Sequence, residues 1–213
     1  MAVLITGANR GLGKGLFDLY HAEGETWGTA RSGDGWIGLE MTDDYSIESL
    51  PDKIRAPALE LLICNAGILL DRDLSMKDQY RKDIWAQSFA VNTWGVFFLI
   101  QALLPKLRQA KTPKIAIISS MMASHTRARG HTYAYRASKA AVLNIGRNLA
   151  AELRPEAISV GIFEPGWVRT RMGTDHASLD VSTACRQLKQ NIDALDLQAS
   201  GRFIALDGSD LPF

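Results

Sequence analysis

Hydrophobic positions along this chain fall into two alternating kinds of segment. Short apolar runs stand at residues 2–6, 25–30, 36–41, 59–64, 114–119, 158–163 and 202–206. Longer stretches with the helical spacing of apolar residues stand at 11–23, 81–108, 132–153 and 182–195, and a brief helix at 46–50 is bracketed by Pro51 and Pro57. Apolar strands that alternate with helices are typical of a parallel sheet buried on both faces. The pattern predicts an α/β fold, a single doubly wound Rossmann-type domain over residues 1–213, with about seven strands joined by right-handed crossovers.

Composition excludes several classes of protein. The chain has 213 residues, of which 46% are hydrophobic and 22% charged, and its formal net charge is +1. No basic field favours nucleic acid. The most apolar run, Val96–Leu104, is shorter than the roughly 20 residues that span a bilayer. A first strand starting at Ala2 leaves no room for a signal peptide. We therefore expect a cytoplasmic protein without a nucleic-acid or membrane partner, in which Cys64 is a buried free thiol.

A glycine-rich turn, TGANRGLG at Thr6–Gly13, follows the first strand and opens the first helix. Gly7, Gly11 and Gly13 would let the backbone approach a pyrophosphate closely, and the helix N-terminus would offer it free N–H groups. This context predicts a dinucleotide site. The alternative is a glycine-rich turn that binds nothing.

The spacing Gly-x-x-x-Gly-x-Gly resembles that of the short-chain dehydrogenase/reductase family. Five further segments match this family in the same order: CNAG at Cys64–Gly67, Val91–Asn92, ISS at Ile118–Ser120, Tyr135-x-x-x-Lys139, and PGWVRT at Pro165–Thr170. The resemblance covers nearly the whole chain. The run YAYRASKAAVLN and the tail SGRFIALDGSDLPF are similar to those of the small C-factor and sniffer-type carbonyl reductases of the family.

The resemblance implies a catalytic set of Asn92, Ser120, Tyr135 and Lys139. Tyr135 would exchange a proton with the carbonyl oxygen, and Ser120 would hydrogen-bond that oxygen. Tyr135 and Lys139 share a helix face, so the ammonium would lower a phenol pKa that is ordinarily about 10. Asn92 would hold a water that relays protons to Lys139. Ser119 and Ser124 are rivals of Ser120, because the gap from Ser120 to Tyr135 is longer than the family's common one.

Contacts to a nicotinamide cofactor are implied in the same way. The expected positions are Gly7, Asn9, Arg10, Gly11, Leu12, Gly13, Arg31, Glu40, Met41, Asn65, Ala66, Gly67, Tyr135, Lys139, Pro165, Gly166, Val168 and Thr170. The second strand ends at Arg31 with no acid at the turn, and Arg10 lies in the glycine loop. Arginine pairs well with a ribose 2′-phosphate, so NADP(H) is expected over NAD(H). The alternative is that both arginines are ordinary surface residues, and Asp34 near the turn weakens the case.

Other features bear on assembly and on the substrate. Aromatic residues on the long helix exceed what one sheet face needs, which favours a homodimer or homotetramer through the two long helices; the alternative is that they fill the core. They are Trp85, Phe89, Trp94, Phe97 and Phe98. The short segment between Thr170 and Gly201, where the family builds its substrate lid, favours an open site. The four histidines are scattered, so no metal is expected.

These observations predict an NADP(H)-dependent oxidoreductase that reduces an aldehyde or ketone to an alcohol, or the reverse, acting on a small molecule. The alternative is a cofactor-binding regulatory or signalling protein of the C-factor type with incidental reductase activity. An alcohol dehydrogenase that prefers NAD is a weaker alternative, because Arg10 and Arg31 disfavour it.

Overall fold

Seven parallel strands form one sheet in the order β3-β2-β1-β4-β5-β6-β7 in the computed structural model, which describes all residues 1–213. The strands are β1 (Val3–Ile5), β2 (Thr26–Ala30), β3 (Ile37–Gly38), β4 (Leu61–Cys64), β5 (Lys114–Ile118), β6 (Ser159–Phe163) and β7 (Phe203–Ile204). The order reverses between β1 and β4, which is the switch point of a doubly wound sheet. The predicted fold class is confirmed, and each strand lies within the apolar run that predicted it.

The helices are α1 (Gly11–His21), α2 (Asp44–Glu48), α3 (Leu50–Lys53), α4 (Lys82–Phe89), α5 (Gly95–Leu107), α6 (Tyr133–Leu153) and α7 (Val181–Asp193). A π-helical turn, η1 (Ala90–Trp94), joins α4 to α5. Short 3₁₀ turns are η2 (Met121–Ala123), η3 (His125–Arg127) and η4 (Arg154–Glu156).

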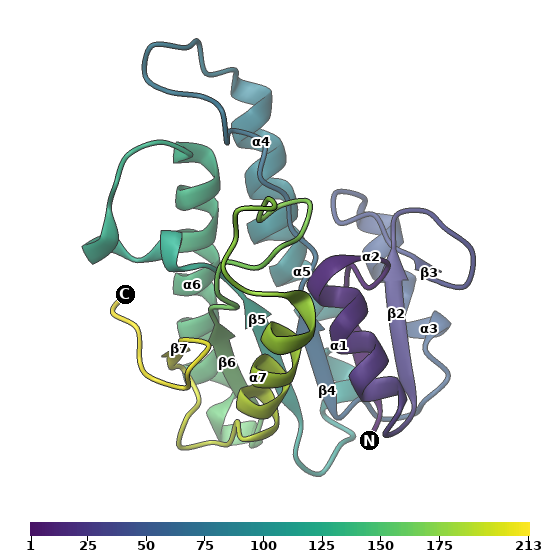
Figure 1. Cartoon of the computed structure of the whole chain (residues 1–213). Helices are drawn as coiled ribbons and strands as arrows, with labels where there is room; N and C mark the ends of the chain where they lie inside the picture. Colours follow the sequence, from purple (N-terminus) through teal and green to yellow (C-terminus); the bar gives the residue numbers. More distant parts are fainter.

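Two helical layers enclose the sheet (Figure 1). Helices α1 and α7 pack side by side on one face, where Leu16 and Leu188 join the inward side chains of β1 and β4. On the other face α2, α3, α5 and α6 bury a larger apolar cluster that includes Leu99 and Val142. Both faces of the sheet are therefore buried. This explains why the strands appear in the sequence as continuous apolar runs and not as alternating apolar and polar residues.

The sequence interpretation was wrong about Pro51. This residue lies in the first turn of α3 rather than beyond a helix end, because proline is tolerated where the backbone N–H has no helical partner. The preceding helix begins at Asp44, with the Asp43 carboxylate accepting the N–H of Tyr45 at 3.1 Å.

Aromatic side chains on α4, η1 and α5 lie largely at the surface. Trp85, Trp94, Phe97 and Phe98 are 37%, 52%, 36% and 47% exposed, and Phe89 is half-buried. The alternative that these aromatics fill the core is therefore wrong for the four exposed ones. The helical stretch Lys82–Leu107 is long and apolar enough to cross a membrane by length and composition alone, and 44% of its most apolar window is buried inside the protein.

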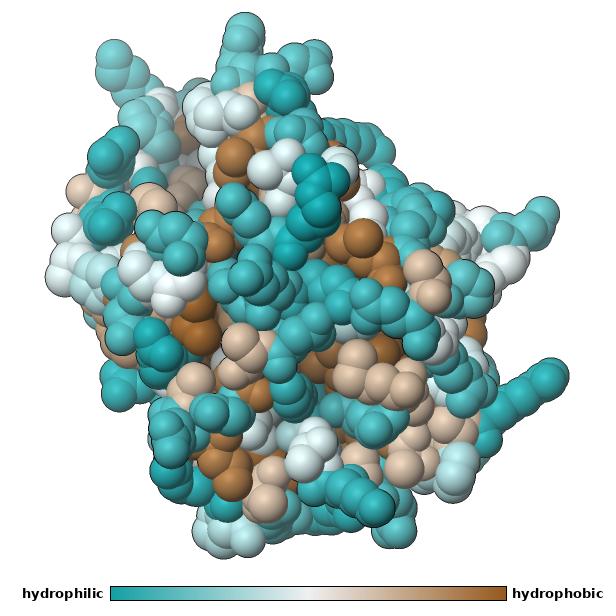
Figure 2. Space-filling model, turned by 60° about the horizontal axis from the view of Figure 1, so that its bottom comes forward, coloured by the Kyte–Doolittle hydropathy of each residue, from teal (hydrophilic) through white to brown (hydrophobic).

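The carboxyl edge of the sheet gathers the loops that bear the candidate residues. It is the upper edge in Figure 1, where the chain enters α1 and where the loop between β4 and α4 rises above the sheet. The opposite edge presents a mostly hydrophilic surface with small scattered apolar patches (Figure 2). Loops at the carboxyl edge of an open parallel sheet are where ligands bind in this architecture, so the site is expected there.

Candidate active site

The glycine loop makes a tight turn between β1 and α1. Gly7 and Gly11 have φ of 66° and 55°, in the left-handed region that favours glycine. A Cβ on Gly13 would lie 2.1 Å from the carbonyl oxygen of Gly7, so no side chain fits there. The N-cap residue Arg10 makes no side-chain cap, and the first turn of α1 has no acidic residue. The N–H groups of this helix end thus remain available to an anion.

The residues after β4 hold the glycine loop in place. The Asn65 amide Nδ2 donates to the carbonyl oxygens of Thr6 at 2.9 Å and Gly7 at 3.2 Å. In return, the Thr6 hydroxyl accepts the N–H groups of Asn65 and Ala66, both at 3.0 Å. No role for Thr6 was predicted from the sequence, although it directly precedes the first glycine; in the fold it lies beside the end of β4.

Tyr135 lies in the first turn of α6 and is only 6% exposed. Ser120 lies close enough to the Tyr135 phenol to lower its pKa, and the Ser120 hydroxyl accepts the Met122 N–H at 3.2 Å. The two rival serines are occupied elsewhere: Ser119 Oγ donates to the carbonyl of Lys139 at 3.3 Å, and Ser124 Oγ pairs with Thr126 Oγ1 at 3.0 Å. Ser120 is therefore the serine that the fold brings to Tyr135.

Lys139 lies one turn further along α6 and is 5% exposed. Its ammonium Nζ donates to the Ile118 carbonyl at 2.8 Å, at the end of β5. Burial lowers the pKa of Lys139 to about 8, and the neighbouring Cys64 acts in the opposite direction. Cys64 is a free buried thiol as expected, and burial raises its pKa to about 12.

The expected lowering of the Tyr135 pKa is not what the structure gives. Burial raises the pKa of Tyr135 to about 12, and the neighbouring Ser120 hydroxyl only partly offsets this. The nearby carboxylate of Glu164 raises the pKa further. The free-energy cost of removing a phenolate from water exceeds the stabilisation that the Ser120 hydroxyl gives it. Tyr135 is therefore protonated at neutral pH.

Asn92 is fully buried in the π-turn η1. Its Nδ2 donates to the Ile68 carbonyl at 2.9 Å and to Ser138 Oγ at 3.0 Å, while its Oδ1 accepts the Ile68 N–H at 2.9 Å. A Cβ on Gly67 would lie 3.2 Å from Asn92 Oδ1 and 3.5 Å from Lys139 Nζ. Asn92, Gly67 and Lys139 therefore meet at one point, and the amide of Asn92 also fixes the loop after β4.

Residues expected at the adenosine side of a cofactor are spread over three segments. Arg10 and Arg31 are both exposed, at the start of α1 and just after β2. The Glu40 carboxylate accepts the N–H and the hydroxyl of Thr42 at 3.2 Å and 3.0 Å, and Met41 packs into the core. The side chains of Glu40 and Met41 are thus engaged within the chain, and their contact with a cofactor stays a prediction.

The loop after β6 closes the other side of the site. Pro165 is followed by Gly166, which has φ of 79°. Val168 is buried and pairs with Leu179. Thr170 packs against the glycine loop, since a Cβ on Gly11 would lie 3.3 Å from its methyl group. The glycine loop and the loop after β6 thus meet at this side of the site.

Two residues near Tyr135 were not predicted from the sequence. Ser138 Oγ donates to the Tyr135 carbonyl at 2.8 Å, and its place one helical turn after Tyr135 could have indicated this. Glu164 is 6% exposed just before Pro165, and burial raises its pKa. Nothing in its sequence context predicted a buried carboxylate.

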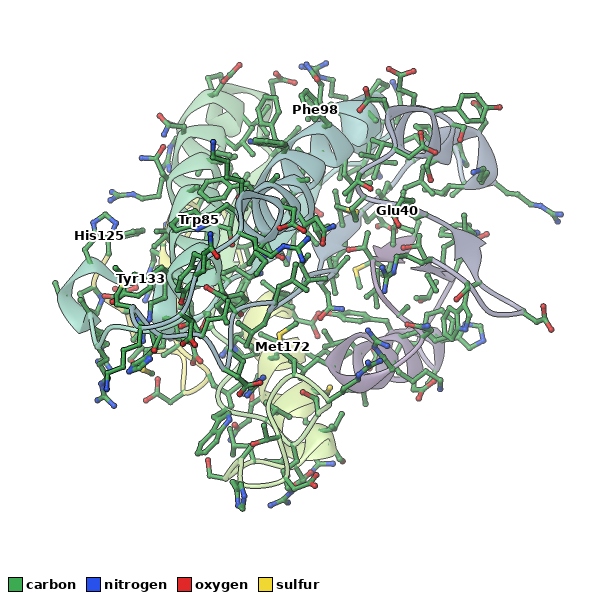
Figure 3. The ribbon with its side chains drawn as sticks, turned by 90° about the horizontal axis from the view of Figure 1, so that it is seen from above. Glu40, Trp85, Phe98, His125, Tyr133 and Met172 are labelled. Atoms are coloured by element: carbon green, nitrogen blue, oxygen red, sulfur yellow. The ribbon has the colours of Figure 1, made fainter.

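A surface hollow adjoins the N-terminus of α6. Its volume is about 350 Å³, and it is lined by Met76, Asp78, Tyr80, Trp85 and Tyr133. Seen from above, Trp85 and Tyr133 lie close together, while Glu40 lies across the molecule (Figure 3). The catalytic candidates therefore have an open, aromatic surface beside them.

Comparisons with known proteins agree on a single family. A family model described as short chain dehydrogenase matches residues 1–179. The C-signal protein of Myxococcus xanthus is 36% identical over 156 residues, covering 73% of this chain and 93% of that protein. The carbonyl reductase Sniffer of D. melanogaster superposes with a TM-score of 0.93 at 28% identity, covering 100% of this chain and 99% of that one. An NADPH-bound carbonyl reductase from chicken fatty liver gives a TM-score of 0.89 at 27% identity, covering 100% and 98%.

Proposed function

Because this chain belongs to the short-chain dehydrogenase family, we propose that it is an NADP(H)-dependent reductase that converts an aldehyde or ketone to an alcohol. The observation that carries the proposal is the meeting of Ser120, Tyr135 and Lys139 beside the glycine loop. Two segments supply these residues, the loop after β5 and the helix α6, and a protein that only bound the cofactor would have no need of all of them.

The residues of the chain divide the proton chemistry among themselves. Tyr135, protonated at neutral pH, donates its proton to the substrate oxygen, and the Ser120 hydroxyl hydrogen-bonds the same oxygen as negative charge develops on it. Lys139 lies one turn away, and its pKa of about 8 lets it hold or release a proton near neutral pH. The nicotinamide cofactor, when bound, supplies the hydride.

The glycine loop fits the pyrophosphate of such a cofactor. The uncapped N–H groups of α1 and the absence of an acid in its first turn favour an anion at this point. Exposed guanidinium groups of Arg10 and Arg31 stand at the two segments that would face the ribose, and they are suited to a 2′-phosphate. The reductase from chicken fatty liver binds NADPH, which supports the same choice.

The first experiment measures NADPH oxidation with a panel of aldehydes, ketones and quinones. We expect turnover in the wild type and a loss of about a hundred-fold or more in Tyr135→Phe, which removes the proton donor. The matched control is Tyr45→Phe, because Tyr45 is 77% exposed and far from the site in the fold. Turnover that survives in Tyr135→Phe would refute the assignment of the acid.

Cofactor preference is tested by replacing Arg31 with alanine. Loss of one charge-assisted hydrogen bond should raise KM for NADPH about ten-fold and leave KM for NADH nearly unchanged. The control is Arg55→Ala, at another exposed arginine. An equal change in KM for both cofactors, or no change in either, would mean that Arg31 does not bind the 2′-phosphate.

A signalling role is the second candidate, because C-signal is 36% identical to this chain. Such a protein could bind NADPH without needing turnover. Binding of NADPH with no turnover of any carbonyl would favour this candidate, whereas turnover that depends on Tyr135 favours the reductase.

We also propose that the chain forms a homodimer, or a homotetramer, through the long helices α4–α5 and α6. The exposed aromatics on α4, η1 and α5 support this, because a contiguous apolar surface of this kind marks an interaction site. The short segment after Thr170 supports a site open to varied substrates, and tight selectivity for one bulky substrate would contradict it. A cytoplasmic location fits a small-molecule reductase of this kind.

A further inference from the structure

Asp71 is a fully buried carboxylate in the loop between β4 and α4, outside every segment that identified the family. Its Oδ2 accepts the backbone N–H of Ala134 at 2.7 Å and that of Tyr135 at 3.5 Å. These are the second and third residues of α6, whose N–H groups an N-cap side chain ordinarily satisfies. Asp71 thus caps α6 from a segment more than 60 residues away in the sequence.

The local N-cap of α6 cannot perform this task. Thr132 has φ of 49°, in the left-handed region, and makes no side-chain cap. Its hydroxyl is buried with no partner. The preceding His131 also has a left-handed φ of 55°. A β-branched residue held in this conformation is strained, so the start of α6 is fixed by tertiary contacts and not by its own sequence.

Asp71 completes a set of contacts around the backbone of Tyr135. On the carbonyl side, Ser138 Oγ donates to the Tyr135 oxygen at 2.8 Å and accepts from Asn92 at 3.0 Å. Asn92 also binds both backbone groups of Ile68, three residues before Asp71. On the N–H side the contact is Asp71 itself. The peptide groups on either side of Tyr135 are therefore tied to the loop after β4.

A residue that only capped the helix would not need to be an aspartate. Asn, Ser or Thr caps a helix as well as Asp does and leaves no buried charge. Here the second oxygen, Oδ1, is buried without a hydrogen-bond partner, which is costly for a carboxylate. A buried polar atom left unpaired in this way calls for a function that offsets its cost.

We propose that Asp71 is a positioning residue for the reductase reaction, which holds the first turn of α6 so that the Tyr135 hydroxyl faces the substrate oxygen. The inference rests on the proposed role of Tyr135 as proton donor. Catalytic groups must be held to within a fraction of an ångström of the productive geometry, and small misplacements lower kcat by large factors.

The negative charge at Asp71 has a second effect on Tyr135. Together with Glu164 it raises the Tyr135 pKa, while Arg72 lowers it. The carboxylate therefore adds to the effect of burial, which favours the protonated Tyr135 that donates a proton during reduction. This effect needs the charge of Asp71 and not its hydrogen bonds, so the pH profile of kcat distinguishes it from helix capping.

The test compares Asp71→Ala and Asp71→Asn with Asp73→Asn, an exposed carboxylate of the same loop that serves as control. Hydrogen exchange at the Ala134 and Tyr135 amides reports the cap without any need for turnover. Initial rates of carbonyl reduction give kcat, KM for NADPH and the pH profile. The hydrogen-exchange and kinetic results then separate helix capping from the positioning of Tyr135.

We expect Asp71→Ala to speed exchange at the two amides and to lower kcat roughly ten- to a hundred-fold, with KM for NADPH changed less than about three-fold. Asparagine keeps an acceptor for the Ala134 N–H, so Asp71→Asn should recover most of kcat. The alkaline limb of the pH profile of kcat should move to lower pH in Asp71→Asn, because this variant lacks the charge that raises the Tyr135 pKa. Asp73→Asn should match the wild type.

Two results would overturn the inference. One is a wild-type kcat in Asp71→Ala despite faster exchange, which would make Asp71 a cap and nothing more. The other is a loss of kcat in Asp71→Asn as large as in Asp71→Ala with an unmoved pH profile. Failure of the proposed function has a different signature, because then the wild type itself would reduce no carbonyl compound.

Discussion

Replacing Lys139 by methionine should stabilise the protein while abolishing turnover. Burial lowers the Lys139 pKa from the 10.5 of an ordinary lysine to about 8. At about 1.4 kcal/mol per pKa unit, carrying the charge in the folded state at pH 7 costs about 3 kcal/mol. Methionine removes this cost and fills similar space, but it gives up the hydrogen bond to Ile118, worth about 1 kcal/mol. The expected net gain at pH 7 is about 2 kcal/mol.

The pH dependence of this gain follows from the direction of the shift. The unfolded lysine binds its proton up to about pH 10.5, whereas the folded one releases it above about pH 8. Wild-type stability therefore rises between these two values, and the advantage of the methionine variant should vanish by about pH 10.

Urea unfolding at pH 7 and at pH 10 measures both quantities, and thermal unfolding at pH 7 should show a Tm raised by about 4–8 °C. The control is Lys111→Met, at an exposed lysine, which should change stability by less than about 0.5 kcal/mol at either pH. A methionine variant less stable than the wild type at pH 7, or a gain that does not shrink with pH, would refute the view that the Lys139 ammonium is desolvated.

Three further predictions concern the acid, the glycine loop and the exposed aromatics. Because burial raises the Tyr135 pKa to about 12, the rate of carbonyl reduction should stay nearly flat from pH 6 to about pH 9 while alcohol oxidation rises with pH; a reduction rate that already falls above pH 7 would contradict this. Gly13→Ala should lower the free energy of unfolding in urea by about 2 kcal/mol or more, because the added Cβ would lie 2.1 Å from a backbone oxygen. The control Gly38→Ala, whose Cβ would have no atom within 4 Å, should have little effect, and equal effects of the two would show that the loop can relax. Phe98→Ser, at a side chain 47% exposed, should leave the monomer folded and shift light scattering from dimer to monomer; a dimer that persists would place the interface elsewhere.

The arrangement of strands and helices could be predicted well because it depends on local patterning. Strands such as β4 and β5 are buried on both faces, so their apolar runs stand out from the sequence around them. The exceptions arise where tertiary contacts override local preference. The long stretch predicted at 81–108 contains the π-turn η1, which turns Asn92 inward, and hydrophobic periodicity cannot distinguish such a turn from a regular helix.

For the site, the sequence by itself determined the family, the glycine loop and the i, i+4 pair of Tyr135 and Lys139, because these depend on short spacings within one element. Only the tertiary structure decided which serine lies beside Tyr135, since Ser119 bonds the Lys139 carbonyl whereas its neighbour Ser120 lies near the phenol. It also decided that burial raises the Tyr135 pKa where a neighbouring ammonium was expected to lower it. The contact from Asp71 to the start of α6 has no signal in the sequence. Desolvation and long-range hydrogen bonds depend on what the fold places around a residue, and no local pattern records that.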